Sequence, residues 1–217
     1  MTQNHPQTDQ HTSSIKADTV GGFLDALGSK QPAPGGGAVA GLCGAIGAAL
    51  AQMVNSYSTG RKSLALHTDA LAADARLLTQ FRDEMLWLAD EDARAYAKLN
   101  AIERLDADDP ARAGYDEAVR DAIAVPSRVM VCAGELLLLV ERMVGRSNPW
   151  LMSDLAIAAI LADACCRAGA WNVRVNAGSV RDVAAREALV RDAESRIEAS
   201  SILCAQVERL CKPENQS

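Results

Sequence analysis

Apolar residues recur with helical spacing along almost the whole chain from residue 18 onward, and no stretch shows the alternation typical of a β-strand. The pattern predicts helices at residues 19–27, 37–57, 64–105, 110–144, 149–176 and 180–211. Loops containing Gly, Pro, Asn or Asp separate these segments. We therefore expect an all-α fold, an antiparallel multi-helix bundle with long helices, formed by a single domain over residues 18–212.

Several predicted helix ends are marked by short polar residues. Asp109 and Asn148 each precede a proline, which is typical of an N-cap followed by the first helical residue. Ser179 is predicted to cap the last helix. Pro126 lies inside the fourth helical segment and is expected to kink or divide it. Residues 1–17 are polar and lack periodicity, so we predict that they form a disordered tail.

The second predicted helix is rich in glycine and alanine and has two different faces. At about 100° per residue, its large apolar side chains fall on one face: Val39, Leu42, Ile46, Leu50 and Met53. The opposite face is nearly bare backbone: Gly37, Gly41, Gly44, Ala48 and Asn55. We expect the first face to be the core stripe, and the second to let another helix or a ligand approach closely.

The composition excludes several classes of protein. Residues 36–54 are uncharged and long enough to cross a membrane, but Gly and Ala dominate them and no aromatic anchors flank them, so we expect a buried helix and no membrane partner. The formal charge of −6 and the lack of a basic run argue against a nucleic-acid partner.

The cysteines and histidines give no sign of a metal site. The six cysteines lack C-x-x-C spacing, and the three histidines lie far from them in the sequence. Most of these thiols fall in apolar helical segments, where cysteine acts as a small buried apolar residue. We expect no bound metal and a reducing, cytoplasmic location.

Asp92 occupies an unusual position in the long third segment. It interrupts an apolar stripe, whereas its neighbour Asp90 points away from that stripe. The stripe is formed by Leu78, Phe81, Met85, Leu88, Tyr96 and Leu99. A carboxylate on a core face is costly unless it is paired or protonated. Asp92 is therefore either a buried acid paired with a backbone donor or an arginine, or an acid/base of altered pKa in a wet pocket.

Asp154 and Lys62 raise similar alternatives. Asp154 is either an acidic residue that the helix dipole stabilises at a helix start, or a member of a functional site. It shares a helix face with Asn172, but the 18 residues between them span roughly 27 Å. The two residues therefore contact different ends of a large ligand, or a second chain brings them into separate sites. Lys62 is either a solvated surface cation or a contact for an anionic partner.

Short segments along the chain form an ordered pattern. They are PAPGGGAV at 32–39, GRK at 60–62, DEDARAY at 90–96, VP at 125–126, NPWLMSD at 148–154 and NVRVN at 172–176. Over residues 18–210 this order resembles the cyclodeaminase/cyclohydrolase family, which comprises the C-terminal domain of formiminotransferase-cyclodeaminase and the stand-alone methenyltetrahydrofolate cyclohydrolases. The resemblance implies an all-helical, usually homodimeric protein that binds a reduced folate and needs no metal or redox cofactor.

The resemblance further implies a one-carbon enzyme that hydrolyses 5,10-methenyltetrahydrofolate to 10-formyltetrahydrofolate. One alternative is a formimidoyltetrahydrofolate cyclodeaminase, which releases ammonia. Another is a helical folate-binding module without activity, because Ser63, Leu64 and Leu155 depart from the family pattern. Both reactions need a positioned acid/base and pass through a cationic amidinium-like centre that a carboxylate can stabilise.

Residue roles follow from the same resemblance. Asp92 and Asp154 are the expected catalytic carboxylates, one as acid/base and the other as an electrostatic or pterin anchor. Lys62 is expected to be their acid/base partner or to bind a carboxylate of the folate. The backbone amides at the start of the glycine-alanine helix are expected to line the site. The predicted substrate-binding residues are Pro34, Gly35, Gly36, Gly37, Asn148, Ser153 and Arg174.

Overall fold

The structure of the protein is a computed structural model, which describes residues 14–106 and 108–212. These residues form helices and loops, without a β-strand among them, so the predicted all-α fold is confirmed. The α-helices are α1 (Val20–Leu27), α2 (Gly36–Ser58), α3 (Thr68–Glu103), α4 (Tyr115–Met143), α5 (Met152–Ala177) and α6 (Val183–Leu210). The short 3₁₀ helices are η1 (Ile15–Ala17), η2 (Lys62–His67), η3 (Pro110–Gly114) and η4 (Pro149–Leu151).

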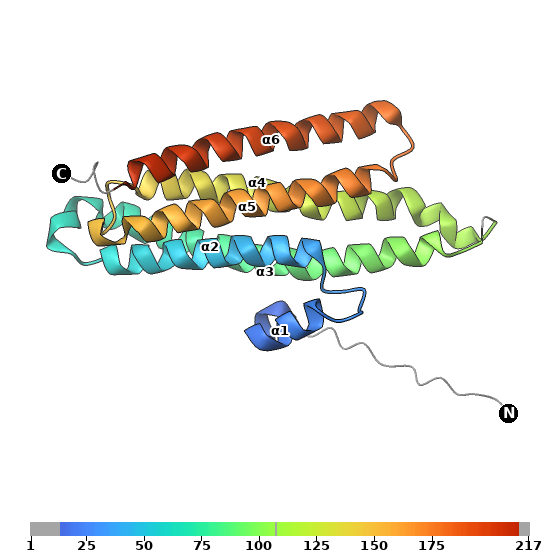
Figure 1. Ribbon diagram of the computed structural model, residues 1–217, viewed down its shortest axis with the longest axis horizontal. Helices are drawn as coiled ribbons and strands as arrows, with labels where there is room; N and C mark the ends of the chain where they lie inside the picture. The colour runs from blue at the N-terminus through green and yellow to red at the C-terminus, as the bar shows by residue number, and fades with distance from the viewer. Residues whose placement is uncertain (1–13, 107, 213–217) are drawn as a thin grey trace.

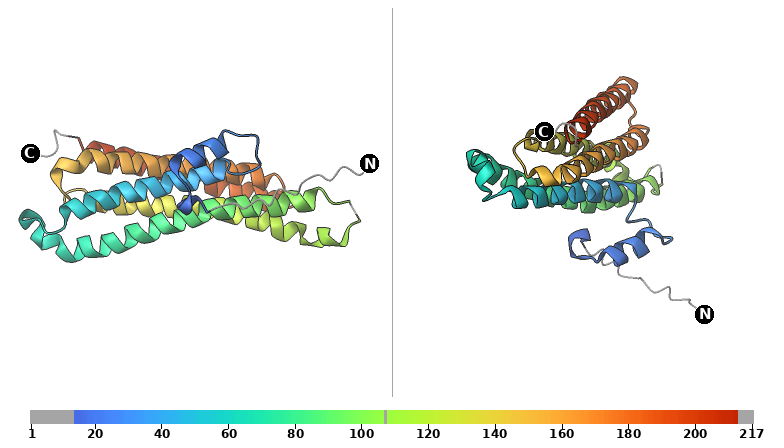
Figure 2. Two further views of the ribbon diagram at one scale, coloured as in Figure 1. Left: turned by 90° about the horizontal axis from the view of Figure 1, so that it is seen from below. Right: turned by 60° about the vertical axis from the view of Figure 1, so that its left-hand side comes forward.

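The five long helices α2 to α6 lie side by side as an elongated bundle (Figures 1 and 2). Helix α1 lies on one side of it, where Phe23 packs against Ala38 of α2 and Ala89 of α3. Helix α2 packs against α3 and α5, and α4 packs against α3, α5 and α6. Successive helices run in opposite directions, because short loops join them. The two ends of the bundle therefore collect different residues. The start of α2 and the end of α5 lie together toward one end, which α3 and α4 extend beyond, and the end of α2 and the start of α5 lie together near the other (Figure 1).

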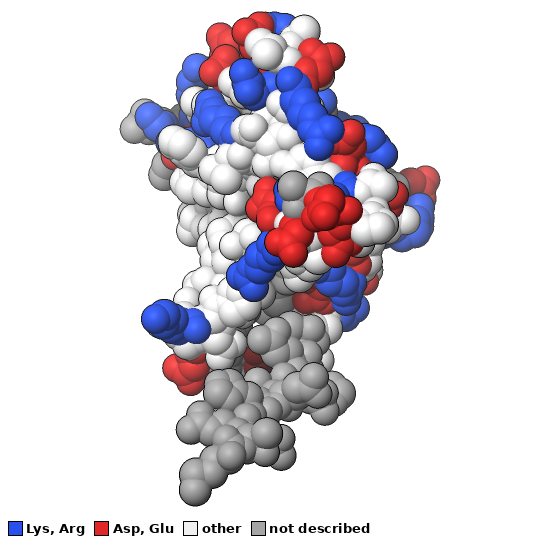
Figure 3. All heavy atoms as spheres, turned by 90° about the vertical axis from the view of Figure 1, so that its right-hand side faces the viewer, with Lys and Arg blue, Asp and Glu red and all other residues white. Residues whose placement is uncertain are grey.

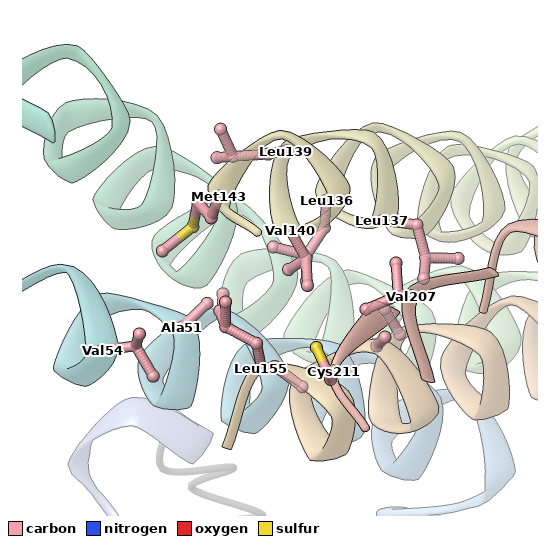
Figure 4. Close-up of a cluster of buried hydrophobic side chains, with 14 of the residues drawn as sticks. Ala51, Val54, Leu136, Leu137, Leu139, Val140, Met143, Leu155, Val207 and Cys211 are labelled. Carbon is pink, nitrogen blue, oxygen red and sulfur yellow. The ribbon is translucent and has the colours of Figure 1, made fainter. Parts of the chain in front are cut away.

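Large aliphatic side chains from α4 fill the centre of one half of the bundle (Figure 4). Leu136, Leu137 and Val140 are fully buried there. They belong to a core cluster that also includes Val54 of α2, Leu155 of α5, Val207 of α6 and Cys211, the residue that follows α6. Leu155, which departs from the family pattern, is therefore a core residue in this half.

Helix α2 is rotated relative to the predicted orientation. Its small residues face inward, whereas Val39 and Ile46 remain 39% and 50% exposed. A Cβ at Gly41 would lie 2.8 Å from the Cβ of Ala89, and one at Gly44 would lie 2.9 Å from the Met85 side chain. The backbones of α2 and α3 are thus too close for larger side chains. The predicted close approach at the glycines is confirmed. The predicted core stripe was wrong for Val39 and Ile46, whereas Leu42, Leu50 and Met53 are partly buried against the core.

Three predicted boundaries also differ from the structure. Helix α4 continues through Pro126 without division. Asp182 caps α6 in place of Ser179, because its Oδ1 accepts hydrogen bonds from the amides of Ala184 and Ala185. Residues 14–17 were assigned to the tail, yet the Ile15 amide donates to Asp90 on α3. Residues 1–13 lie outside the described part of the chain.

Three helical segments, α2, η3–α4 and η4–α5, are long and apolar enough to cross a membrane by length and composition alone. Between 44% and 56% of the most apolar window of each is buried inside the bundle. Packing against neighbouring helices thus buries about half of the residues in these apolar windows. The predicted lack of a membrane partner stays a prediction.

Candidate active site

A cleft of about 260 Å³ opens where α2 begins and α5 ends, beside α3 and α4, which continue beyond it (Figure 1). Its walls come from the loop before α2 and from helices α2, α3, α4 and α5. The residues that line it are Pro32, Ala33, Gly35, Gly36, Gly37, Asp92, Ala93, Ala95, Tyr96, Ala122, Asn172, Val175 and Asn176. This volume holds a small ring system, and polar groups of several helices converge on it.

Asp92 projects from α3 into this cleft, where its carboxylate packs against the backbone of Gly37. Among the described residues, none donates a hydrogen bond to the Asp92 oxygens or forms an ion pair with them. Burial raises the pKa of Asp92 above its usual range. Of the two interpretations of this residue, the structure excludes a buried acid neutralised by an arginine. An unpaired carboxylate with a raised pKa in a cleft is typical of an acid/base group, and this role of Asp92 stays a prediction.

The first turn of α2 forms the wall beside Asp92. Gly35 is the N-cap, and its carbonyl accepts a hydrogen bond from the Val39 amide. The amides of Gly36, Gly37 and Ala38 precede the first intrahelical donor, so they have no acceptor within the helix. The positive end of the helix dipole therefore lies at the cleft. Gly35, Gly36 and Gly37 line the cleft as predicted from their position.

Two asparagines of α5 complete the opposite wall and were not among the predicted site residues. The Nδ2 of Asn176 donates to the Ala122 carbonyl at 2.6 Å, and that of Asn172 donates to the Ala168 carbonyl at 3.3 Å. The Oδ1 of Asn172 lies near Gly36. The sequence signal was their spacing of four residues, which places both on one helix face.

Four other predicted residues lie at the opposite end of the bundle: Lys62, Asn148, Ser153 and Asp154. Lys62 is exposed in η2, and Asp154 is half-buried in the first turn of α5. Helix α2 separates the two ends by about 33 Å over its 23 residues. Within one chain, the structure therefore does not bring Asp154 or Lys62 to the Asp92 cleft.

Hydrogen bonds fix the loop that carries Asn148. The Asn148 amide donates to the Ser58 hydroxyl at 2.8 Å, and the Asn148 side chain caps η4 by accepting from the Trp150 amide. The nearby Asp74 carboxylate is buried and pairs with Arg146 at 3.0 Å. Burial raises the pKa of Asp74, while Arg146 and Arg142 partly offset this rise. The end of the bundle that holds Asn148 and Asp154 thus contains an ordered cluster of polar side chains.

The two remaining predicted residues lie outside the cleft walls. Pro34 belongs to the loop before α2 but is not among the lining residues. Arg174 stacks over the Trp171 ring, with 5.3 Å between its guanidinium carbon and the ring centroid, and lies 4.0 Å from Glu194. Its guanidinium is therefore engaged on the outer side of α5.

The described residues contain no group of three His, Cys, Asp or Glu side chains that could hold a metal ion. None of the six cysteines, all of which lie in the described part of the chain, forms a disulfide, and burial raises the pKa of each of them. The polar groups at the cleft are consequently a carboxylate, carboxamides, a phenol and backbone amides. That the protein needs no metal or cofactor stays a prediction.

In sequence and in structure, the chain is similar to proteins of one family. Residues 19–195 match the family described as formiminotransferase-cyclodeaminase. A methenyltetrahydrofolate cyclohydrolase of Methylorubrum extorquens is 31% identical over 186 residues, covering 82% of this chain and 88% of that protein. The formimidoyltransferase-cyclodeaminases of Gallus gallus and Mus musculus are 25% and 29% identical, and the match covers about 81% and 78% of this chain.

The match spans only about a third of those two longer proteins, 34% and 32% of their length. In structure, the chain resembles a formiminotetrahydrofolate cyclodeaminase of Thermotoga maritima with a TM-score of 0.78. That likeness covers 91% of this chain and 96% of the other, at 23% sequence identity, and supports the shared fold. Since the family match extends over most of the chain, the protein belongs to the formiminotransferase-cyclodeaminase family.

Proposed function

We propose that the protein hydrolyses 5,10-methenyltetrahydrofolate to 10-formyltetrahydrofolate. The observation that carries the proposal is the unpaired carboxylate of Asp92 in a cleft that also presents the free amides of α2. A cationic amidinium centre, such as the 5,10-methenyl bridge, is attracted to such a carboxylate. The match to a cyclohydrolase along most of both chains supports this choice of reaction.

The reaction needs one proton acceptor and one proton donor. Asp92, as a carboxylate, removes a proton from the water that attacks the bridging carbon, which gives a neutral tetrahedral adduct. The bond from that carbon to N5 then breaks as the adduct hydroxyl becomes the formyl C=O and loses its proton to solvent. N5 takes up the proton that Asp92 removed from water, and the formyl group remains on N10. A raised pKa brings Asp92 closer to the operating pH, where one group can both accept and return a proton.

Asp154 and Lys62 reach the cleft only if a second chain supplies them. Helix α2 contains no charged residue, and its outward face together with that of α5 exposes apolar side chains, among them Val39, Ile46, Ile157, Trp171 and Val175. An uncharged band runs along one side of the molecule when it is viewed from the cleft end (Figure 3). Exposed apolar surface of this kind is typical of an interface. We infer a homodimer through this face.

In the homodimer that we propose, the twofold axis is perpendicular to α2 and α5, which reverses the direction of the partner's helices. The cleft end of one chain then lies beside the far end of the other. In this arrangement Asp154 and Lys62 act with Asp92 across the interface. Asp154 anchors the pterin or stabilises the cation, and Lys62 binds a folate carboxylate. Asn148 and Ser153 are further contacts for the same substrate.

Mixing two inactive variants tests the shared site. When Asp92→Asn and Asp154→Asn chains are denatured and refolded together in equal amounts, half of the sites in each mixed dimer are intact. About a quarter of the activity of the unmodified protein should return, as twofold symmetry requires. If each chain holds a whole site of its own, the mixture stays inactive.

The second candidate activity is formimidoyltetrahydrofolate cyclodeaminase, because the relatives include several proteins with that name. Assays of 5,10-methenyl- and 5-formimidoyltetrahydrofolate side by side, by absorbance and by ammonia release, distinguish the two reactions. Hydrolysis without ammonia release supports the cyclohydrolase. Folate binding without turnover of either compound identifies the inactive binding module. Six cysteines that form no disulfide also favour a reducing, cytoplasmic location.

A further inference from the structure

Pro126 changes the hydrogen bonding of α4 at the cleft. In a helix, the carbonyl of residue 122 normally accepts from the amide of residue 126. Proline has no amide hydrogen, so the Ala122 carbonyl has no such donor. The Nδ2 of Asn176 takes this place at 2.6 Å. The proline thus creates a specific acceptor for a side chain of the neighbouring helix.

This hydrogen bond fixes which way the Asn176 amide faces. A carbonyl oxygen only accepts, so the atom opposite Ala122 must be the amide nitrogen. The other atom of the amide, Oδ1, has no donor among the described residues, and Asn176 lines the cleft. Asn172 is held in a similar way, since its nitrogen donates to the Ala168 carbonyl. Both asparagines therefore offer an acceptor oxygen to a ligand.

We propose that Asn176, held by the carbonyl that Pro126 frees, acts with Asn172 to recognise the 2-amino-4-oxopyrimidine edge of a pterin by accepting from its N–H groups. This inference rests on the proposed folate activity and adds the orientation of the substrate. The edge carries adjacent donors, the ring N3–H and the 2-amino group, which match two acceptor oxygens. The anionic glutamate tail of a folate would instead be repelled by the Asn oxygens and by the Asp92 carboxylate.

The chemistry also separates the roles of the polar groups in the cleft. Asn172 and Asn176 are one helical turn apart on α5, about 6 Å along the axis. Asp92 lies on α3 against Gly37, at the start of α2. With the pyrimidine edge held by the asparagines, the Asp92 carboxylate remains available for the reacting one-carbon unit. Pro126 and Ala122 are positioning residues, because they act through Asn176.

Binding measurements with paired ligands test the proposal. The probes are 5-formyltetrahydrofolate and its analogue in which hydrogen replaces the 2-amino group, with affinities measured by calorimetry. The unmodified protein should bind the first about tenfold more tightly, as expected for one hydrogen bond. Asn176→Leu should lose this preference, and should raise KM for 5,10-methenyltetrahydrofolate more than it lowers kcat.

Pro126→Ala gives a second, independent test. The new amide at residue 126 competes for the Ala122 carbonyl and releases the Asn176 side chain. The variant should weaken folate binding without loss of thermal stability, since alanine suits a helix interior better than proline. In the Asn176→Leu background, the same substitution should have no further effect on affinity. Gly134→Ala, also in α4 and with open space around it, is the control for a helix-stabilising change.

The outcomes separate this inference from the proposed function. An Asn176→Leu protein that still prefers the 2-amino compound overturns the inference, as does additive weakening in the double variant. Folate turnover by the unmodified protein stands in either case. If the unmodified protein neither binds nor converts any folate, the proposed function fails, and the inference fails with it.

Discussion

The backbone of Gly37 lies directly against the carboxylate of Asp92, so close that a Cβ at residue 37 would overlap the carboxyl group. Any side chain at residue 37 must therefore displace Asp92 from its place in the cleft. Glycine at residue 37 leaves room for the Asp92 carboxylate, whereas Gly41 and Gly44 let α2 pack closely on α3. The same contact places the Asp92 carboxylate next to the free amides at the start of α2.

Gly37→Ala should reduce turnover by about 100-fold or more, because a displacement of about 1 Å of a catalytic group has an effect of this size. The helical circular dichroism spectrum should be unchanged. Gly134→Ala is the matched control, since a Cβ there meets nothing within 4 Å. Steady-state kinetics of both variants check the prediction, and a fully active Gly37→Ala protein would contradict the role of this contact.

Asp92→Asn should lower turnover by about 10² to 10⁴-fold, the usual contribution of a positioned acid/base. The same variant should be more stable than the unmodified protein near neutral pH. Burial raises the pKa of Asp92, so the folded state loses stability as pH rises from the unfolded pKa to the folded one. The stabilisation should therefore vanish in acid, at about pH 4 and below. Thermal melts at several pH values measure it.

The pH profile of kcat/KM should report the same carboxylate. If Asp92 works as the base, activity falls as the pH drops through its folded pKa. Because burial raises that pKa, the acid limb should lie above about 3.9, the value for a free aspartate. Asp92→Glu, which keeps a carboxylate, should retain an acid limb in any residual activity. A profile that is flat across this range would assign the proton transfer to another group.

The helices could be predicted from the sequence because their apolar spacing and their capping residues are local features. Asp92 could also be identified, since a single carboxylate interrupts an apolar stripe. The orientation of α2 could not be predicted from its own residues. Its most apolar face turns outward because the small residues on the other face let α3 approach, and that depends on two helices together.

Asn172 and Asn176 illustrate a second limit. On their own helix they resemble ordinary polar residues of a surface. Their place in the site depends on α4, where Pro126 leaves the Ala122 carbonyl free for Asn176. Asp154 and Lys62 show the converse case, because the sequence identified them but one chain does not bring them to the cleft. Tertiary packing decides both cases.

The Asp74–Arg146 pair should matter for stability more than any exposed pair. The Asp74 side chain is only 6% exposed. Arg146→Met leaves this carboxylate buried without its partner, which should cost about 3–5 kcal/mol in the free energy of unfolding near neutral pH. The cost should shrink in acid, because Asp74 then becomes protonated and neutral.

Denaturant melts at neutral and acidic pH check this prediction. Replacing both partners, as in Asp74→Leu with Arg146→Met, should recover most of the lost stability, because no charge stays buried. Arg196→Met is the control, since Arg196 and Asp192 form an exposed pair on α6. Its loss should cost less than about 1 kcal/mol. If Arg146→Met and Arg196→Met lowered the free energy of unfolding equally, burial of Asp74 would not increase the stabilisation by its ion pair.

Ile46→Glu should separate the proposed dimer into inactive monomers. Ile46 is 50% exposed at the middle of the uncharged outer face of α2, and a twofold axis through this face would bury two glutamates close together. Light scattering after size-exclusion chromatography should show the mass of one chain, with an unchanged helical spectrum. Ile202→Glu on α6, where the side chain is 62% exposed, should remain dimeric and active. An Ile46→Glu protein that stays dimeric excludes this face as the interface, and an active monomer would place the whole site within one chain.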